Sequence, residues 1–136
     1  GKRVILIDDS IVRGTTSLKI VRMVREAGAT EVHLRSASPP IRWPDFYGID
    51  MPDREHLLAA NKTLAEMVAY LEVDSLGFLS VDGLYWAMEA GPRNDASPQF
   101  TDHYFTGDYP TRLLDREVAE GRNEQSERQL SFLVSA

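Results

Sequence analysis

The sequence predicts an α/β fold built on a parallel sheet with flanking helices, and three successive patterns indicate it. A short apolar run over residues 3–7, rich in β-branched side chains, is typical of a strand covered on both faces. Apolar residues at helical spacing follow at Ile20, Met23, Val24 and Ala27. Gly28 stands where a helix is expected to end, and Val32 and Leu34 then alternate with polar residues as in a second strand. Strand, helix and strand joined this closely form a parallel, right-handed βαβ unit.

The middle of the chain predicts a loop followed by a second helix and strand. Prolines interrupt residues 36–53 repeatedly, so this segment is expected to be an ordered loop and not a regular helix. A helix is expected over residues 61–71, whose apolar stripe comprises Leu64, Met67, Val68 and Leu71. The run "SLGFLSVD", residues 75–82, predicts a further strand.

The last third of the chain predicts little regular structure. Asp82 is expected to cap a short helix over residues 83–88. Three residues of that helix, Tyr85, Trp86 and Met88, are assigned to the core. Residues 114–129 are highly charged and predict either a solvated helix or a partly disordered tail.

Composition narrows the classes of protein to consider. A chain of 136 residues that is 43% hydrophobic suits one globular domain with a real core. A net charge of -6 opposes binding to a nucleic acid or to an anionic membrane, so neither is expected as a partner. Cysteine is absent, which excludes disulfides and thiolate nucleophiles and fits a cytoplasmic protein.

The stretch "VILIDDSIVRGTTS", residues 4–17, is the most informative motif. On the predicted βαβ unit its polar half connects the carboxyl end of a strand to the amino end of a helix, where open α/β sheets bind ligands. The free N–H groups of a helix start attract anions, and Gly14 lets the backbone approach a phosphate closely. Four hydroxyls add donors without bulk: Ser10, Thr15, Thr16 and Ser17.

The adjacent carboxylates of Asp8 and Asp9 need a second explanation, because they would repel a phosphate. Carboxylates accept hydrogen bonds from paired hydroxyls and bind magnesium. A ribose 5-phosphate satisfies both halves of the motif. The plainer interpretation, ordinary capping of a helix, accounts for any one of these residues but poorly for the ordered string.

The string resembles the phosphoribosyl pyrophosphate (PRPP) signature of the type I phosphoribosyltransferases, and more narrowly the amidophosphoribosyltransferase family. The resemblance continues through "REAGATEVHLRSASPPIRWPDFYGIDMP", "SLGFLSVDGLYWAM" and "FTGDYPT". It implies a type I phosphoribosyltransferase-like fold in part: residues 1–113 would be the C-terminal part of that domain, and residues 114–136 a polar tail.

The resemblance also implies a reaction and a set of binding residues. In this family, ammonia from glutamine displaces pyrophosphate from PRPP and gives 5-phosphoribosylamine, the first step of de novo purine biosynthesis. Asp8 and Asp9 match the pair that holds the ribose hydroxyls and the Mg²⁺ accompanying PRPP. No catalytic residue is assigned in this chain. The implied substrate-binding set is Asp8, Asp9, Ser10, Ile11, Val12, Arg13, Gly14, Thr15, Thr16 and Ser17.

Further expectations follow from what the family contains and this chain does not. The glutaminase domain and the upstream half of the phosphoribosyltransferase domain are outside the sequence, so the chain alone is expected to be inactive. The full-length protein is expected to be a homo-oligomer inhibited by purine nucleotides. Where some members carry cluster cysteines, this chain has Asp45, Thr101 and Tyr104, so no iron–sulfur cluster is expected.

Two alternative functions remain open at this stage. A non-catalytic homologue that senses PRPP or a nucleotide would keep the same loop. A receiver-type signalling domain would also begin with an acidic pair; its phospho-acceptor would be Asp74 or Asp82, but no lysine follows Lys62 to complete that site.

Four other residues have a functional and a plainer interpretation. His33 and His103 are candidates for acid–base chemistry, although a surface or hydrogen-bonded histidine is favoured for His33. Arg42 and Trp43 would either face a purine nucleotide or belong to a packed loop.

Overall fold

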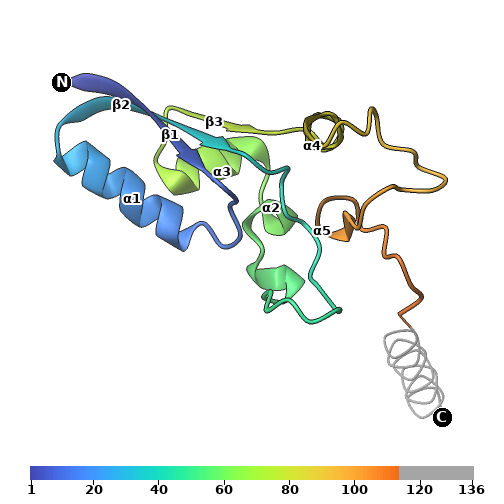
Figure 1. Ribbon diagram of the computed structural model, residues 1–136. Helices are drawn as coiled ribbons and strands as arrows, with labels where there is room; N and C mark the ends of the chain where they lie inside the picture. The colour runs from blue at the N-terminus through green and yellow to red at the C-terminus, as the bar shows by residue number, and fades with distance from the viewer. Residues whose placement is uncertain (114–136) are drawn as a thin grey trace, which may run out of the picture.

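A computed structural model describes residues 1–113 and contains the predicted parallel sheet. Its three strands, β1 (Lys2–Asp8), β2 (Ala29–Ser36) and β3 (Ser75–Phe78), lie in the order β1-β2-β3. Both pairings are parallel. Helices α1 (Thr15–Glu26) and α3 (Leu64–Leu71) connect the strands and lie on the same side of the sheet (Figure 1). The βαβ prediction is therefore confirmed, and Gly28, with φ +96°, follows α1 as expected.

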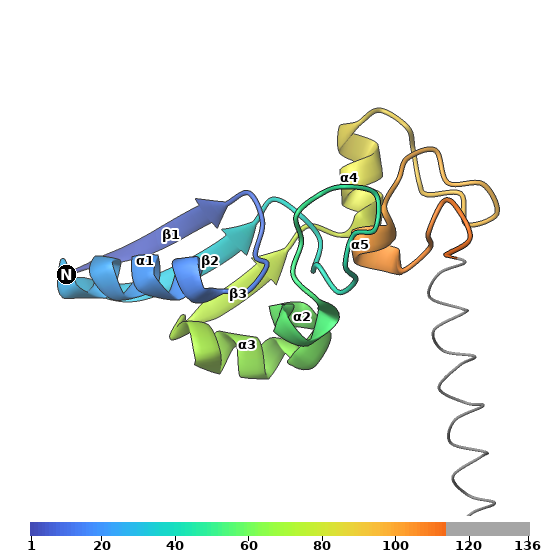
Figure 2. The ribbon, with the colours of Figure 1, turned by 90° about the horizontal axis from the view of Figure 1, so that it is seen from below.

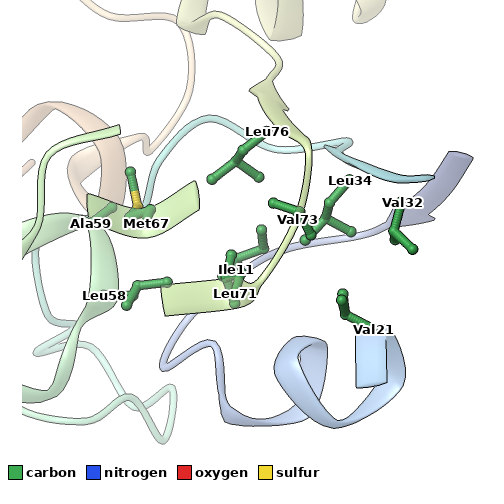
Figure 3. Packing of buried hydrophobic residues seen from close by; sticks show 10 residues of the cluster. All are labelled: Ile11, Val21, Val32, Leu34, Leu58, Ala59, Met67, Leu71, Val73 and Leu76. Atoms are coloured by element: carbon green, nitrogen blue, oxygen red, sulfur yellow. The ribbon is translucent and has the colours of Figure 1, made fainter. Parts of the chain in front are cut away.

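The core lies between the sheet and these two helices (Figure 3). Alternate residues of β2, Val32 and Leu34, point toward the helices and are almost completely buried. Val21 of α1 and Leu71 of α3 both pack against this same face of the sheet. The buried cluster comprises Ile11, Val21, Val32, Leu34, Leu58, Ala59, Met67, Leu71, Val73 and Leu76.

The opposite face of the sheet is open, which contradicts the expectation that the first strand is covered on both faces. Ile5 and Ile7 are 66% and 79% exposed because no described element packs over them. The predicted stripe on the first helix is also partly wrong, since Ile20 and Met23 are exposed. The buried positions of α1 are Ser17 and Val21, one turn apart on the side that faces the sheet.

The predicted helix over residues 61–71 is confirmed as α3, which begins three residues later than predicted, at Leu64. A short 3₁₀ turn, η1 (Arg54–His56), and helix α2 (Leu58–Asn61) precede α3. Thr63 is the N-cap of α3. Its hydroxyl accepts from the N–H of Glu66, and the Glu66 carboxylate accepts from the N–H of Thr63. This reciprocal capping begins α3 at Leu64, and it leaves the Leu64 side chain 52% exposed.

The third strand is shorter than predicted because Ser80 begins a helix. Its hydroxyl accepts from the N–H of Gly83 and caps α4 (Val81–Ala87), so Asp82 lies in the first turn and is not the cap. Tyr85 is buried as predicted, but Trp86 and Met88 are exposed. Tyr85 and Trp86 point about 100° apart around α4, and of the two only Tyr85 faces the interior.

The segment after α4 folds around a buried ion pair. The Arg93 guanidinium contacts Asp102 at 2.6 Å, and Tyr85 donates to the same carboxylate at 2.8 Å. The last described helix, α5 (His103–Thr106), follows directly. Within residues 1–113, no helix is long and apolar enough to cross a bilayer. The prediction for residues 114–136 falls outside the part of the chain that the structure describes.

Candidate functional site

A cavity of about 500 Å³ lies beside the carboxyl ends of the strands. Figure 2 shows all three strands pointing toward this end of the sheet, where the connecting loops, α2 and α5 also lie. The cavity is lined by Asp8, Asp9, Ser10, Val12, Arg13, Gly14, Thr15, Thr16, Ser17, Asp50 and Pro52. The structure thus gathers nine of the ten residues of the predicted binding set around one space.

The amino end of α1 opens toward this cavity without a cap. Gly14 precedes the helix in the left-handed conformation, and no side chain caps the helix by accepting from its first backbone N–H groups. The first turn carries no acidic residue, although acidic residues commonly occupy that position. The backbone N–H groups of Thr15 and Thr16 therefore donate no hydrogen bond to any described residue. These free N–H groups can bind an anion.

Gly14 is required at this position for two physical reasons. Its φ of +77° is a conformation that L side chains rarely adopt. A Cβ there would also lie 2.8 Å from Cδ2 of Leu58 and 3.1 Å from Cε1 of Tyr70. The loop is therefore pressed against α2 and α3, and the N–H of Leu58 donates to the carbonyl of Val12 at 2.8 Å.

The two carboxylates lie beside the helix start and are held by the loop itself. Oδ1 of Asp8 accepts from the N–H of Asp9 at 3.1 Å, and Oδ2 of Asp8 accepts from the Ser17 hydroxyl at 3.2 Å. Oδ1 of Asp9 accepts from the N–H of Ser10 at 2.6 Å. No ion pair to either carboxylate occurs among the described residues, so their charge is available to a ligand.

Ile11 is the one member of the predicted set that does not line the cavity. Its side chain is 2% exposed and belongs to the core cluster. Any contact from Ile11 to a ligand would be made by its backbone. Burying Ile11 anchors the middle of the loop, which leaves the residues on either side to face the cavity.

Asp50 and Pro52 line the cavity but are absent from the set predicted from sequence. They come from the proline-rich loop that follows β2. The carboxyl ends of parallel strands share one edge, so a loop after the second strand is expected near the loop after the first. That reasoning could have indicated the loop, although not which of its residues reach the cavity.

The two histidine candidates are both hydrogen-bonded and lie away from this cavity. His33 contacts the Ser75 hydroxyl at 2.9 Å and the Glu31 carboxylate at 3.0 Å, in agreement with the plainer interpretation. His103 is fully buried, and its Nε2 lies 2.9 Å from Oδ1 of Asp45. Neither histidine lines the cavity formed by the loop.

Arg42 and Trp43 line a different cavity, of about 620 Å³. The guanidinium of Arg54 lies 4.0 Å from the Trp43 ring centroid, and a Cβ at Gly107 would lie 2.6 Å from Cε2 of Trp43. The indole is therefore partly covered by Arg54 and Gly107 and is half-buried. The packed-loop interpretation of Trp43 is the one that the structure supports.

The structure argues against Asp74 as the phospho-acceptor of a receiver domain. Asp74 precedes β3 and thus lies at the opposite end of the sheet from Asp8. Its Oδ2 accepts from the N–H of Val32 at 2.6 Å and from Arg25 at 2.8 Å, contacts that lower the pKa of Asp74 and occupy the carboxylate. A phospho-acceptor has to be free and close to the acidic pair.

A three-stranded parallel sheet with flanking helices, whose first strand ends in two carboxylates before an uncapped helix, is part of a type I phosphoribosyltransferase fold. The solved structure of glutamine PRPP amidotransferase from B. subtilis, complexed with ADP and GMP, matches with a TM-score of 0.72 and 50% identity. The match covers 83% of this chain and 25% of that chain. A second solved structure, of "the allosteric regulatory enzyme of purine biosynthesis", matches with a TM-score of 0.69 and 46% identity, over 83% of this chain and 24% of that one.

Sequence relatives identify the family. The chain is 62% identical over 136 residues to an amidophosphoribosyltransferase of Rhizobium etli and 49% identical over 113 residues to that of Bacillus subtilis. These matches cover 99% and 83% of this chain, and 26% and 24% of the relatives, so the chain spans about a quarter of their length. No protein-family model matches the sequence. The chain belongs to the amidophosphoribosyltransferase family and matches its C-terminal part.

Proposed function

We propose that the protein to which this chain belongs is an amidophosphoribosyltransferase that transfers ammonia from glutamine to PRPP. The products would be 5-phosphoribosylamine, pyrophosphate and glutamate. Residues 1–113 would supply the part of the active site that binds the ribose 5-phosphate. The observation that carries this proposal is the single cavity that joins an uncapped helix start to the carboxylates of Asp8 and Asp9.

Each half of the cavity suits one half of the substrate. The free N–H groups of the first turn of α1, with the hydroxyls of Thr15 and Thr16, would bind the 5-phosphate. The carboxylates of Asp8 and Asp9 would accept hydrogen bonds from the two ribose hydroxyls. Held at both ends, the sugar would be fixed while its anomeric carbon faces the rest of the active site.

Magnesium is the metal that this donor set fits. Asp8 and Asp9 are hard oxygen donors without an ion-pair partner among the described residues, and Mg²⁺ is usually held by one or two carboxylates together with substrate phosphates. No group of three or more candidate metal ligands occurs within residues 1–113, so the remaining ligands would come from PRPP and water. The metal would neutralise charge on the departing pyrophosphate.

Purine nucleotides are proposed as inhibitors at the same cavity. The B. subtilis structure similar to this chain was determined with ADP and GMP. A nucleoside monophosphate carries the 5-phosphate and ribose hydroxyls that the loop would recognise in PRPP. A purine nucleotide and PRPP would therefore compete for the cavity, because both contain a ribose 5-phosphate.

The test is binding and turnover by the full-length protein with Asp8→Asn and Asp9→Asn combined. We expect Mg²⁺-dependent PRPP affinity, measured by calorimetry, to fall at least about tenfold because two hydroxyl acceptors and the metal ligands lose their charge. A matched control, Glu26→Gln with Glu89→Gln, removes two charges away from the cavity and should bind normally. Unchanged affinity in the aspartate variant would contradict the assignment.

The same preparation separates an enzyme from a sensor. An amidophosphoribosyltransferase should release pyrophosphate from PRPP when glutamine or an ammonium salt is supplied. A non-catalytic homologue would bind PRPP with the same dependence on Asp8 and Asp9 but release none.

A further inference from the structure

The carboxylate of Asp45 organises the proline-rich loop from a fully buried position. Its Oδ2 accepts from the N–H groups of Tyr47 and Ile49, both at 2.8 Å. Its Oδ1 lies 2.9 Å from Nε2 of His103, and neither side chain is exposed to solvent. Burial raises the pKa of Asp45, but the hydrogen bonds from Ile49, Tyr47 and His103 outweigh it and leave that pKa below its ordinary value. A folded loop therefore keeps this carboxylate ionised.

The role of His103 includes its hydrogen bond to Asp45 and is not explained by packing alone. Its ring is surrounded by Tyr47, Tyr104 and Tyr109, with centroid distances of 5.2, 3.9 and 4.9 Å. The second ring nitrogen, Nδ1, is buried without a partner among the described residues. A buried polar atom without a partner is costly, so a phenylalanine would suit the packing better. What a phenylalanine cannot supply is the contact to Asp45.

Other contacts connect the same two segments, which lie far apart in the sequence. The N–H groups of Arg42 and Trp43 both donate to the carbonyl of Tyr104, at 2.9 and 3.1 Å. The Tyr109 hydroxyl donates to the carbonyl of Pro44 at 2.9 Å. The proline-rich loop is thus attached to the segment around α5, and the Asp45–His103 contact is the buried polar part of that attachment.

We propose that Asp45 and His103 are positioning residues for the cavity that would bind PRPP. Ile49, whose N–H donates to Asp45, directly precedes Asp50, and Asp50 and Pro52 form the part of the cavity wall that the proline-rich loop supplies. Anchoring Asp45 on His103 would set where this wall stands relative to Asp8 and Asp9. This inference rests on the proposed function, because it assigns the wall to the PRPP site.

The effect should fall on substrate binding more than on the chemical step. Neither Asp45 nor His103 lines the cavity, so neither touches the reacting atoms. A loop that is free to move has to be ordered again each time a ligand binds, which weakens affinity. An interaction that acts equally on substrate and transition state changes KM and leaves kcat unchanged.

The experiment compares variants of the full-length enzyme by steady-state kinetics at varied PRPP. His103→Phe keeps the ring packing and removes the hydrogen bond, and Asp45→Ala removes both ends of the anchor. In each we expect KM for PRPP to rise about fivefold or more with kcat within about twofold. His103→Gln retains an N–H donor and should recover at least half of the loss in affinity on a logarithmic scale.

The control is His33→Phe, which removes the contact of another histidine with a carboxylate, Glu31, away from the cavity. It should match the wild type in both constants, and circular dichroism should show that every variant is folded. Equal KM values for wild type, His103→Phe and Asp45→Ala would overturn the inference. A wild type that does not consume PRPP, or that is indifferent to the Asp8 and Asp9 substitutions, would instead overturn the proposed function.

Discussion

The hydroxyl of Ser17 donates to Oδ2 of Asp8 across 3.2 Å and joins the first turn of α1 to the end of β1. Ser17 is 5% exposed, so this bond is partly shielded from solvent. The helix that offers N–H groups to a phosphate therefore also orients the carboxylate proposed for the ribose. The Ser17 side chain therefore connects the helix start proposed for the phosphate to the Asp8 carboxylate proposed for the ribose.

Ser17→Ala is accordingly expected to weaken PRPP binding without unfolding the protein. The variant frees the Asp8 carboxylate to rotate, and loss of one hydrogen bond to a charged group predicts an affinity about three- to tenfold lower. Calorimetric titration of the full-length protein with PRPP and Mg²⁺ would measure this. Ser38→Ala, which removes a half-buried, hydrogen-bonded hydroxyl outside the cavity, serves as control. Equal affinities in the two variants would contradict the role of Ser17.

Gly14→Ala should destabilise the protein by about 2–4 kcal/mol, because backbone strain and overpacking against Leu58 act together. Gly91→Ala separates the two causes. Gly91 has a similar φ of +72°, but a Cβ there meets nothing within 4 Å, so only strain of about 1 kcal/mol applies. Urea unfolding followed by tryptophan fluorescence gives both values. A difference of less than about 1 kcal/mol between the variants would show that α2 yields to the added methyl.

Asp102 should give the protein a stability that is lost in acid. Burial raises the pKa of Asp102, but hydrogen bonds from Arg93, Tyr85 and Thr106 outweigh it and leave the pKa below its ordinary value. The ionised form is thus favoured by folding. Its contribution is complete above the unfolded pKa of about 3.9 and disappears as the pH falls through the lower folded-state pKa.

The variant Asp102→Asn tests this prediction between pH 3 and pH 7. We expect a loss of about 2–4 kcal/mol at neutral pH and a shallower decline in acid. Asp95→Asn removes a carboxylate that pairs with the same Arg93 but is 91% exposed, and should cost less than about 0.5 kcal/mol. Similar losses in the two variants would mean that burial of Asp102 contributes nothing.

Thr63→Ala should show that α3 depends on its capping box. The substitution removes the hydroxyl that accepts from the N–H of Glu66, which predicts a loss of about 1 kcal/mol and a melting temperature several degrees lower. Thr101→Ala changes an exposed threonine outside any helix and should leave the melting temperature unchanged. The capping assignment would be wrong if the two variants melted together.

Local patterns were sufficient to predict the parts of the fold that depend on neighbours in sequence. The apolar run before Asp8, the helix after Gly14 and the strand at Val32 are each recognisable within a dozen residues. The motif between them also placed the cavity, because a strand end joined to a helix start has only one arrangement in a right-handed βαβ unit.

Contacts between distant segments could not be predicted in the same way. Which face of α1 is buried depends on where the sheet passes. Ile20 and Met23 of the predicted apolar stripe are therefore exposed, whereas Ser17 and Val21 are buried. The pairing of Asp45 with His103 joins residues 58 positions apart, and the sequence around either residue does not indicate its partner. Asp50 and Pro52 were missed at the cavity for the same reason.

The open face of the sheet has a practical consequence for work on residues 1–136 by themselves. Ile5 and Ile7 lie exposed on β1, and β1 is the edge of the described sheet, with backbone groups available for pairing. Exposed apolar patches on an unpaired edge strand promote self-association. Preparations of this chain alone are therefore expected to aggregate increasingly with concentration. Light scattering across a dilution series should precede any titration, and a mild non-ionic detergent should reverse the effect.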